Sequence, residues 1–397
     1  MERREVLVIG GGPAGAATAI GLARRGRDVL LVERAPAWRW RACGVFSSPG
    51  TRTALSRLGV SDEMLGTATR PIPAMRVETA PGTTFRLTYG DDGTGRTGAL
   101  GLDRSAIDPH LLELARRAGA EVRTGTTVSR IRDGVASLAD DAAQVGAQVV
   151  VGADGLRSIV ARSAGVARGS WLGGRPALSF HVEDPEPDQL RDARMIAFDG
   201  GYVGLAPVPG GRVNVGIVLA GRAWQARLRA EGALAVASAV MAGVPATADD
   251  PVPWAAPRIC DAMEGVSPVG ARAARRAGPD WLLVGDAAGF LDPFTGEGLL
   301  RALRSAAQAT AAIDRHLAGD GHALAMYDRT IARRTRTKDA VSVVIQGFLA
   351  VPAAFEYVAQ RLAERPAIRE TMGGVIGDLA PASAALDPRF LVGLLRP

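Results

Sequence analysis

Three glycines near the N-terminus have the spacing of a phosphate-binding turn. Gly10, Gly12 and Gly15 form a G-x-G-x-x-G pattern between a short apolar run, 6–9, and a segment of helical composition, 13–25. The first glycine permits a tight turn, the second lets backbone N–H groups approach a pyrophosphate, and the third lets the helix lie close to the strand. The N-terminus of that helix would then face the phosphate charge.

A carboxylate completes this pattern. Glu33 ends a second apolar run, 29–32, where it can accept hydrogen bonds from the hydroxyls of a ribose. The small residue Ala14 lets the first helix pack closely. The segment 93–98 also reads G-x-G-x-x-G, but turn residues precede it and no helical segment follows, so we predict a loop there. The order strand, glycines, helix, strand and acid predicts a dinucleotide site.

Two later segments repeat the order of buried strand, turn and helix. The apolar run 149–151 is followed by Asp154-Gly155 and by a helix capped near Ser158. The run 281–284 is followed by Gly285-Asp286, a loop through Gly296-Glu297-Gly298, and a helix from Leu299. An Asp-Gly or Gly-Asp pair alone is a common turn, so the evidence lies in the combination with the first motif.

In this order, the three motifs resemble those of the geranylgeranyl reductase and flavoprotein aromatic hydroxylase (p-hydroxybenzoate hydroxylase-like) superfamily. The resemblance extends from Val6 to about Leu317 and implies that the cofactor is FAD. It also implies that Asp286 accepts hydrogen bonds from ribityl or ribose hydroxyls, and that the helix after it points its N-terminus at the flavin. The implied cofactor-binding residues are Gly10, Gly12, Ala14, Gly15, Glu33, Gly44, Arg104, Val128, Asp154, Asp286, Pro293, Gly296, Gly298 and Leu299.

The fold expected from this resemblance is α/β, with an α+β substrate lobe. A Rossmann-type FAD-binding domain carries an inserted, mostly antiparallel β-sheet domain and a C-terminal helical segment. We predict the discontinuous FAD-binding domain at 1–74, 98–170 and 268–320. The substrate-binding sheet is predicted at 75–97 and 171–267, and the helical region at 321–397.

Features of the predicted substrate lobe favour the reductases. Tyr202, Pro207 and 214–216 match a reductase Y-x-W-x-F-P element and a following N-V-G strand, and Cys43-Gly44 matches the Cys-Gly that the reductases place near the flavin. Gly204 and Ala206 stand where the family has tryptophan and phenylalanine, so we expect a larger or reshaped pocket. The resemblance makes Cys43 and Tyr202 the candidate catalytic residues. Trp38 and Trp40 are expected to cover the cofactor domain.

The chemistry stays open between several alternatives. Reduction of a C=C bond in a hydrophobic prenyl, lipid or natural-product substrate is favoured. Hydroxylation of an aromatic or polyketide-like natural product by an FAD-dependent monooxygenase is the main alternative. A halogenase is disfavoured because Lys338, the only lysine, lies in the C-terminal helices. Intact Asp154, Asp286 and glycines argue against a binding protein that merely kept the fold.

Composition sets the remaining expectations. The net charge is +6, but the arginines are scattered, which disfavours nucleic-acid binding. Two distant cysteines and four histidines indicate neither a disulfide framework nor a metal site. With no second nicotinamide fingerprint, we expect NAD(P)H to bind transiently or another electron donor to act as reductant. We expect a cytoplasmic protein with a hydrophobic small-molecule substrate and possible peripheral membrane contact or a redox partner.

Overall fold

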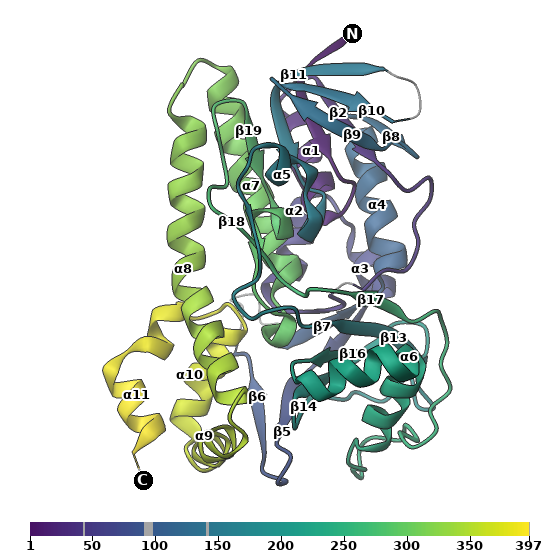
Figure 1. Ribbon diagram of the computed structural model, residues 1–397, viewed down its shortest axis with the longest axis vertical. Helices are drawn as coiled ribbons and strands as arrows, with labels where there is room; N and C mark the ends of the chain where they lie inside the picture. The colour runs from purple at the N-terminus through teal and green to yellow at the C-terminus, as the bar shows by residue number, and fades with distance from the viewer. Residues whose placement is uncertain (43, 91–97, 140–142, 397) are drawn as a thin grey trace.

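The computed structural model describes residues 1–42, 44–90, 98–139 and 143–396. Figure 1 shows a sheet near the N-terminus at the top of the view, a second sheet below it on the right, and a long helix on the left that runs from the upper part to a group of C-terminal helices. The mixed α/β fold expected from the sequence is confirmed.

The first sheet contains the strand pair that flanks the glycine turn. Its strands run in the order β8-β2-β1-β11-β10-β9, with β19 alongside β11. The neighbours β8, β2, β1, β11 and β19 are parallel, whereas β9 and β10 form an antiparallel ribbon on β11. The strands are β1 (Glu2–Ile9), β2 (Val29–Glu33), β8 (Glu121–Thr124), β9 (Val128–Arg132), β10 (Val135–Leu138), β11 (Gln144–Gly152) and β19 (Trp281–Leu283).

Alternation along β1 explains how both faces of this sheet are buried. Val6 and Val8 point into one apolar cluster with α1, α4 and α7, while Leu7 and Ile9 point into another with α5 and the β9–β10 ribbon. The helices of this half are α1 (Pro13–Ala23), α2 (Gly50–Arg57), α3 (Asp62–Ala68), α4 (Arg104–Arg117), α5 (Ile159–Ser163) and α7 (Gly298–Leu317). The carboxyl ends of the parallel strands therefore open on one edge.

The second sheet is mostly antiparallel, as predicted, in the order β17-β13-β16-β15-β14-β5-β6. The pair β14 and β5 is parallel, which joins the antiparallel hairpin β5–β6 to the rest of the sheet. One face packs on α6 (Arg222–Ala242), and the other contributes to an apolar cluster with Phe294 and the C-terminal helices. The strands are β5 (Ala74–Glu78), β6 (Thr84–Thr88), β13 (Ala177–Glu183), β14 (Ala193–Phe198), β15 (Gly201–Val208), β16 (Arg212–Leu219) and β17 (Glu264–Val266).

Helix α6 is the one long helix among the described residues of the second lobe, and it begins at Arg222. Gly232 has a φ of +86°, so the helix is broken there into two parts, and the buried residues Val236, Ala237, Val240 and Met241 all lie in the second part.

The C-terminal region is helical, as predicted, and covers the β5–β6 edge of the second sheet (Figure 1). Its helices are α8 (Ala323–Leu349), α9 (Pro352–Glu364), α10 (Pro366–Ile376) and α11 (Pro388–Leu395). Two small sheets link the halves: β3 (Phe46–Ser47), β4 (Thr69–Ile72) and β7 (Ala99–Leu102), and β12 (Ala167–Arg168), β18 (Ala271–Ala273) and β20 (Gly289–Phe290). The predicted loop 93–98 lies outside the described residues except for Gly98.

Candidate functional site

The glycine turn has the geometry that its sequence predicted. Gly10 has a φ of +107°, and a Cβ there would lie 2.4 Å from the carbonyl oxygen of Ala153. A Cβ at Gly15 would lie 1.9 Å from the carbonyl oxygen of Gly10, so only glycine allows this contact between helix and strand. A Cβ at Gly12, just before α1, would meet nothing within 4 Å. The turn therefore leaves open space beside the helix N-terminus, where a pyrophosphate would lie.

Glu33 faces this turn from the end of β2. Its carboxylate accepts hydrogen bonds from the N–H groups of Gly11 at 2.8 Å and Ala35 at 3.0 Å, and pairs with Arg41 at 3.0 Å. Burial would raise the pKa of Glu33, but these three donors more than offset it, so the pKa lies below its ordinary value. A carboxylate held ionised in this way can accept hydrogen bonds from ribose hydroxyls. The sequence did not single out Arg41.

Asp154 has a buried oxygen atom that no described residue satisfies. Its Oδ2 accepts a hydrogen bond from Ile159 N at 2.5 Å, while Oδ1 has no hydrogen-bond partner in the described part of the chain. The side chain of Ser158 caps α5, as predicted. Burial raises the pKa of Asp154, against hydrogen bonds from Ser158 and Ile159. An unsatisfied buried oxygen at this sheet edge fits a cofactor that supplies the missing donor. Val128, predicted nearby, is buried in β9.

The loop before α7, residues 285–297, is the segment that the resemblance assigns to the flavin, and it is called the flavin loop below. Asp286 lies in the short turn Gly285–Ala288 and is half-buried, and the desolvation of its carboxyl raises its pKa despite nearby Arg301 and Arg104. Gly296 has a φ of +66°, and a Cβ there would lie 2.2 Å from the ring of Phe46. Helix α7 begins at Gly298, so its N-terminus faces this loop. The side chain of Leu299 is buried in the apolar cluster between α7 and α1.

A cavity of about 180 Å³ lies between this loop and the second sheet. Its wall on the cofactor side includes Gly44, Asp286, Pro293 and Gly296. The sheet supplies the opposite wall from one face of its strands: Ala177, Ser179, Met195, Tyr202, Gly204, Ala206, Asn214, Gly216 and Val218. Gly204 and Gly216 are direct partners in the β15–β16 ladder, so two facing strands lack side chains at the floor of the cavity. Gly204 and Ala206, which stand where the reductases have tryptophan and phenylalanine, therefore lie in the wall of this cavity.

Tyr202 lines this cavity, but its hydroxyl is already engaged. It donates to Asp292 Oδ1 at 2.6 Å, and Asp292 also accepts from Arg175 at 2.6 Å and from Gln346 at 2.7 Å. Burial raises the pKa of both Asp292 and Tyr202. The ring of Tyr202 meets that of Phe294 edge-on at 5.1 Å. This buried network joins the sheet, the flavin loop and α8. The sequence analysis did not identify Asp292 as the centre of this network, although Asp292 immediately precedes Pro293, which was predicted to bind the cofactor.

The segment between Glu33 and Gly44 crosses from the turn to the cavity. Trp40 packs on His181 with 4.4 Å between ring centroids, and its Nε1 donates to the carbonyl oxygen of Ser179 at 3.3 Å. Trp40 therefore covers β13 of the second sheet rather than the domain with the glycine turn, which corrects the expectation from the sequence. Trp38 is 36 % exposed. Arg104 donates to the carbonyl oxygen of Gly44 at 2.8 Å and so holds the end of this segment. Cys43 lies outside the described residues.

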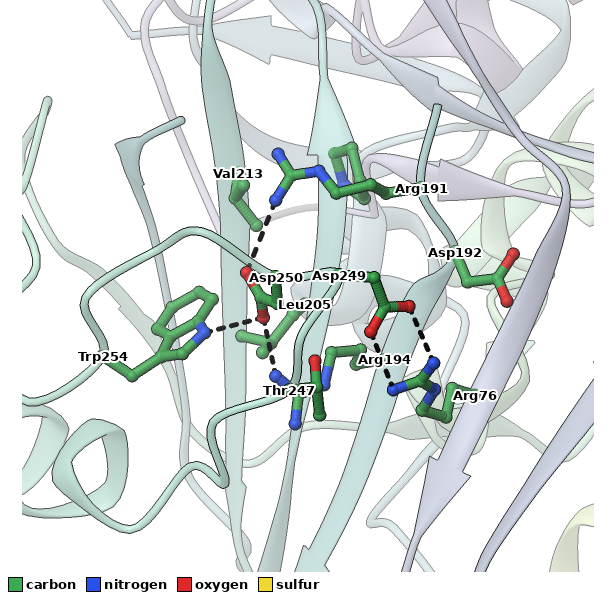
Figure 2. A pocket seen from close by; sticks show the side chains of 11 residues that line it. Arg76, Arg191, Asp192, Arg194, Leu205, Val213, Thr247, Asp249, Asp250 and Trp254 are labelled. Carbon is green, nitrogen blue, oxygen red and sulfur yellow. Dashed lines mark hydrogen bonds and ion pairs between the residues drawn. The ribbon is translucent and has the colours of Figure 1, made fainter. Parts of the chain in front are cut away.

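A second, charged pocket lies over Leu205 and Val213, whose side chains belong to the sheet face that packs on α6 (Figure 2). Asp250 accepts hydrogen bonds from Arg194 at 2.6 Å and from Trp254 at 2.8 Å, and Arg76 pairs with Asp249 at 2.7 Å. The pocket holds about 20 Å³, roughly the space of one water molecule. Its charges pair with one another, and these pairs tie Asp249 and Asp250 to Arg76 on β5 and Arg194 on β14.

Other site types find no support in the described residues. No group of three or more histidine, cysteine or acidic residues there could hold a metal ion. Cys260 is a free, exposed thiol. No single helix among the described residues has the length and apolar composition to cross a bilayer, although α8 and α9 pass that test together as a pair bent by 115°.

Comparisons with known proteins support an FAD-binding protein of this fold. A family model described as "FAD binding domain" matches residues 3–208. The menaquinone reductase of Mycolicibacterium smegmatis is 29 % identical over 75 % of this chain and 73 % of its own length. A geranylgeranyl bacteriochlorophyll reductase-like protein from Thermoplasma acidophilum superposes with a TM-score of 0.78 at 20 % identity, over 100 % of this chain and 97 % of that one. The flavin-dependent halogenase CmlS gives 0.75 at 25 % identity, over 85 % of this chain and 63 % of the halogenase.

Proposed function

The chain belongs to the FAD binding domain family and is an FAD-dependent oxidoreductase, and we propose that it reduces a C=C bond of a hydrophobic substrate. The substrate class is a prenyl, lipid or natural-product molecule. Bound FAD, once reduced, would supply the hydride. The chain's own residues would hold the cofactor, exclude water from the reacting carbons and orient the double bond.

One observation carries this proposal: an apolar cavity directly adjoins the residues assigned to the flavin. Met75, Met195, Phe294 and Val218 line the same cavity as Asp286. Such a lining favours a hydrocarbon substrate, because burying apolar surface stabilises binding by about 25 cal/mol per Å². The name of the mycobacterial relative, a menaquinone reductase, supports reduction as the reaction class.

The electron donor and the partners are also part of the proposal. We take NAD(P)H, bound transiently, or another redox protein as the source of electrons. A substrate that fits this apolar cavity would dissolve in a membrane, and peripheral contact with the membrane would give the protein access to it. The bent pair α8 and α9 is the segment whose composition suits such contact.

An oxygen-free half-reaction tests the proposal. The FAD-loaded protein is reduced under nitrogen, candidate prenyl substrates are added, and reoxidation is followed at the flavin absorption band. A reductase reoxidises its flavin and yields a product heavier by two hydrogens. A flavin that stays reduced with every alkene, but reacts when oxygen and an aromatic substrate are admitted, would contradict the proposal.

Gly204→Trp tests whether this cavity holds the substrate. A Cβ at Gly204 would make an ordinary contact, 3.4 Å from Met195 Cε, so the larger side chain projects into the cavity without an immediate backbone clash. We expect FAD retention to persist and reoxidation by bulky alkenes to fall at least about tenfold. Leu190→Trp, at a position 64 % exposed, is the matched control for an added tryptophan.

A second candidate is hydroxylation of an aromatic or polyketide-like molecule. The paired glycines at 204 and 216 favour it, because the floor between them can accept a flat ring system. The two candidates differ in their need for oxygen: reduction of an alkene reoxidises the flavin under nitrogen, whereas hydroxylation requires oxygen.

A further inference from the structure

A second apolar pocket lies among the C-terminal helices. It holds about 60 Å³ and is lined by residues of the β5–β6 hairpin, of the flavin loop, and of α8, α9, α10 and α11. Every described residue in its lining is apolar. Cavities with such a lining stay free of water and accept hydrocarbon groups. The lining therefore favours a hydrocarbon as the occupant of this pocket.

Phe294 is shared by this pocket and the cavity beside the flavin loop, because its side chain lines both. Its ring meets that of Tyr202 in the cavity wall edge-on, with 5.1 Å between centroids. The backbone N–H of Phe294 donates to Asp292 Oδ1 at 3.0 Å, which fixes the turn that carries the ring. A single aromatic side chain of the flavin loop thus stands at the boundary between the two apolar spaces.

The register of the β5–β6 hairpin connects the same two spaces. Met75 on β5 lines the cavity, and its ladder partner on β6, Leu87, lines the pocket. Val77 is two residues further along β5 and so on the same face, and both Val77 and its ladder partner Phe85 line the pocket. One apolar face of the hairpin therefore runs from the cavity into the pocket.

Two polar contacts hold α8 against the flavin loop beside this boundary. Gln346 Nε2 donates to Asp292 Oδ1 at 2.7 Å, and Lys338 is paired with Glu297 at 2.9 Å. Val341, in the stretch of α8 between these two anchors, lines the pocket, as does Ile345 next to Gln346. The contacts therefore fix the position of the pocket relative to the cavity.

The two spaces differ in polarity and in size. The cavity has polar groups in its wall, among them Ser179, Asn214 and Asp286, whereas the described lining of the pocket has none. A cavity of about 150 Å³ takes one benzene ring. The cavity of about 180 Å³ therefore has room for the reacting end of a substrate but not for a long chain. The pocket offers further room for a hydrocarbon end.

We propose that this pocket, called the tail pocket from here on, binds the far hydrocarbon end of a substrate whose reacting end lies in the cavity, with the chain passing Phe294. The inference rests on the proposed function for the reaction at the reacting end. It narrows the substrate class to molecules with an extended hydrocarbon chain. Val344 lines the tail pocket and is 42 % exposed, so a longer chain would continue there toward the surface.

Binding of two prenyl alcohols to the oxidised, FAD-loaded protein tests the tail pocket without turnover. Farnesol is one isoprene unit longer than geraniol. Equilibrium dialysis gives the two dissociation constants, and the flavin absorption band reports whether the cavity is occupied. Both alcohols should perturb the flavin band. Farnesol should bind at least about tenfold more tightly, because its additional carbons leave water for an apolar lining.

Ala385→Leu fills the tail pocket. Ala385 lines it and is 4 % exposed, so the added carbons would occupy the space meant for the chain. The ratio of the geraniol to the farnesol dissociation constant should fall at least about fivefold. Ser383→Leu places the same side chain at an exposed position of the same short segment, 382–386, and should keep the parent ratio.

Photolabelling of the unsubstituted protein locates the chain directly, and it stays informative if Ala385→Leu folds poorly. A farnesol analogue with a diazirine at its far end is irradiated in the FAD-loaded protein, and the labelled peptides are sequenced by mass spectrometry. The label should fall on peptides of the C-terminal helices that line the pocket, within residues 341–394. An excess of farnesol should prevent it.

The results separate this inference from the proposed function. The tail pocket would be overturned by a parent-like ratio in folded Ala385→Leu, by label only outside 341–394, by farnesol binding that leaves the flavin band unchanged, or by no farnesol binding at all. Alkene-driven reoxidation under nitrogen would still support the reductase. If the chain binds as expected but no alkene reoxidises the flavin, the proposed reduction is wrong and the tail pocket serves a different reaction of the same cavity.

Discussion

The two walls of the cavity are held by different kinds of contact. On the cofactor side, the determining contacts are local or join consecutive motifs, such as the hydrogen bond from Gly11 to Glu33 across the first turn. On the substrate side they join distant parts of the chain: Tyr202 to Asp292, Arg175 to Gln346, and His181 to Asp261. The first wall is a backbone cradle, and the second is a set of side-chain networks.

This difference separates cofactor binding from substrate choice. A backbone cradle needs glycine at defined positions and tolerates little variation, because an added Cβ would meet other backbone atoms. The substrate wall depends on which side chains project from one face of a sheet, and these can change without loss of the sheet. Gly204 and Ala206 illustrate such a change at the cavity floor.

The largest expected effect is loss of FAD binding in Gly12→Val. A Cβ there meets no protein atom within 4 Å, so the protein should fold, but the valine side chain would occupy the space expected for the pyrophosphate. Gly15→Val is the contrast, because its Cβ would lie 1.9 Å from a carbonyl oxygen and should destabilise the fold itself. Flavin content and thermal melting measure the two effects. Full flavin occupancy in Gly12→Val would contradict the assignment of this turn.

The sequence was sufficient for the cofactor wall because strand, glycine turn and helix follow one another within a few residues. It placed the turn, the second strand and the Ser158 cap, and the structure confirms those elements. It did not find Asp292 as the centre of a network, or Trp40 on His181, because these contacts depend on the register of β13 to β16 and on how α8 returns to the sheet. The individual FAD contacts and the domain boundaries remain predictions.

A pH-dependent effect is expected where the flavin loop meets the C-terminal helices. Glu297 is paired with Lys338 at 2.9 Å, and burial, with Asp378 nearby, raises its pKa to about 7. Since the folded-state pKa exceeds the unfolded value near 4.5, the stability from this group is present below pH 4.5 and lost as pH rises to 7. The loss is roughly 3 kcal/mol by the pKa difference.

Glu297→Gln should remove this part of the pH dependence. Urea unfolding of parent and variant at pH 4.5, 6 and 8 gives the comparison, and other titrating groups cancel in the difference. The parent should lose stability relative to the variant between the first and last pH. A difference that is constant with pH would show that the carboxyl is not held protonated by burial.

A smaller effect is expected for single polar contacts to the cofactor. Asp286→Ala should weaken FAD binding by about 10- to 150-fold, because a charge-assisted hydrogen bond contributes about 1.5–3 kcal/mol. Arg104→Ala should also weaken it, through the Gly44 carbonyl that Arg104 holds at 2.8 Å. Titration of the FAD-free protein with FAD measures both, with the exposed Asp188→Ala as control. Parent-like affinity in both variants would place the family alignment in error at these positions.

The smallest expected effect concerns Cys43, which lies between two positions that line the cavity, Ala42 and Gly44. Its role rests on the resemblance to the reductases, where a Cys-Gly pair lies near the flavin. A thiol beside the reacting carbons can pack against them or deliver a proton, so Cys43→Ala and Cys43→Ser should retain FAD and slow alkene-driven reoxidation about tenfold, roughly 1.4 kcal/mol of barrier. If Cys43→Ala keeps the parent rate, the thiol is structural. If both variants slow the reaction while FAD stays bound, the thiol takes part in the step after cofactor binding, as the resemblance to the reductases implies.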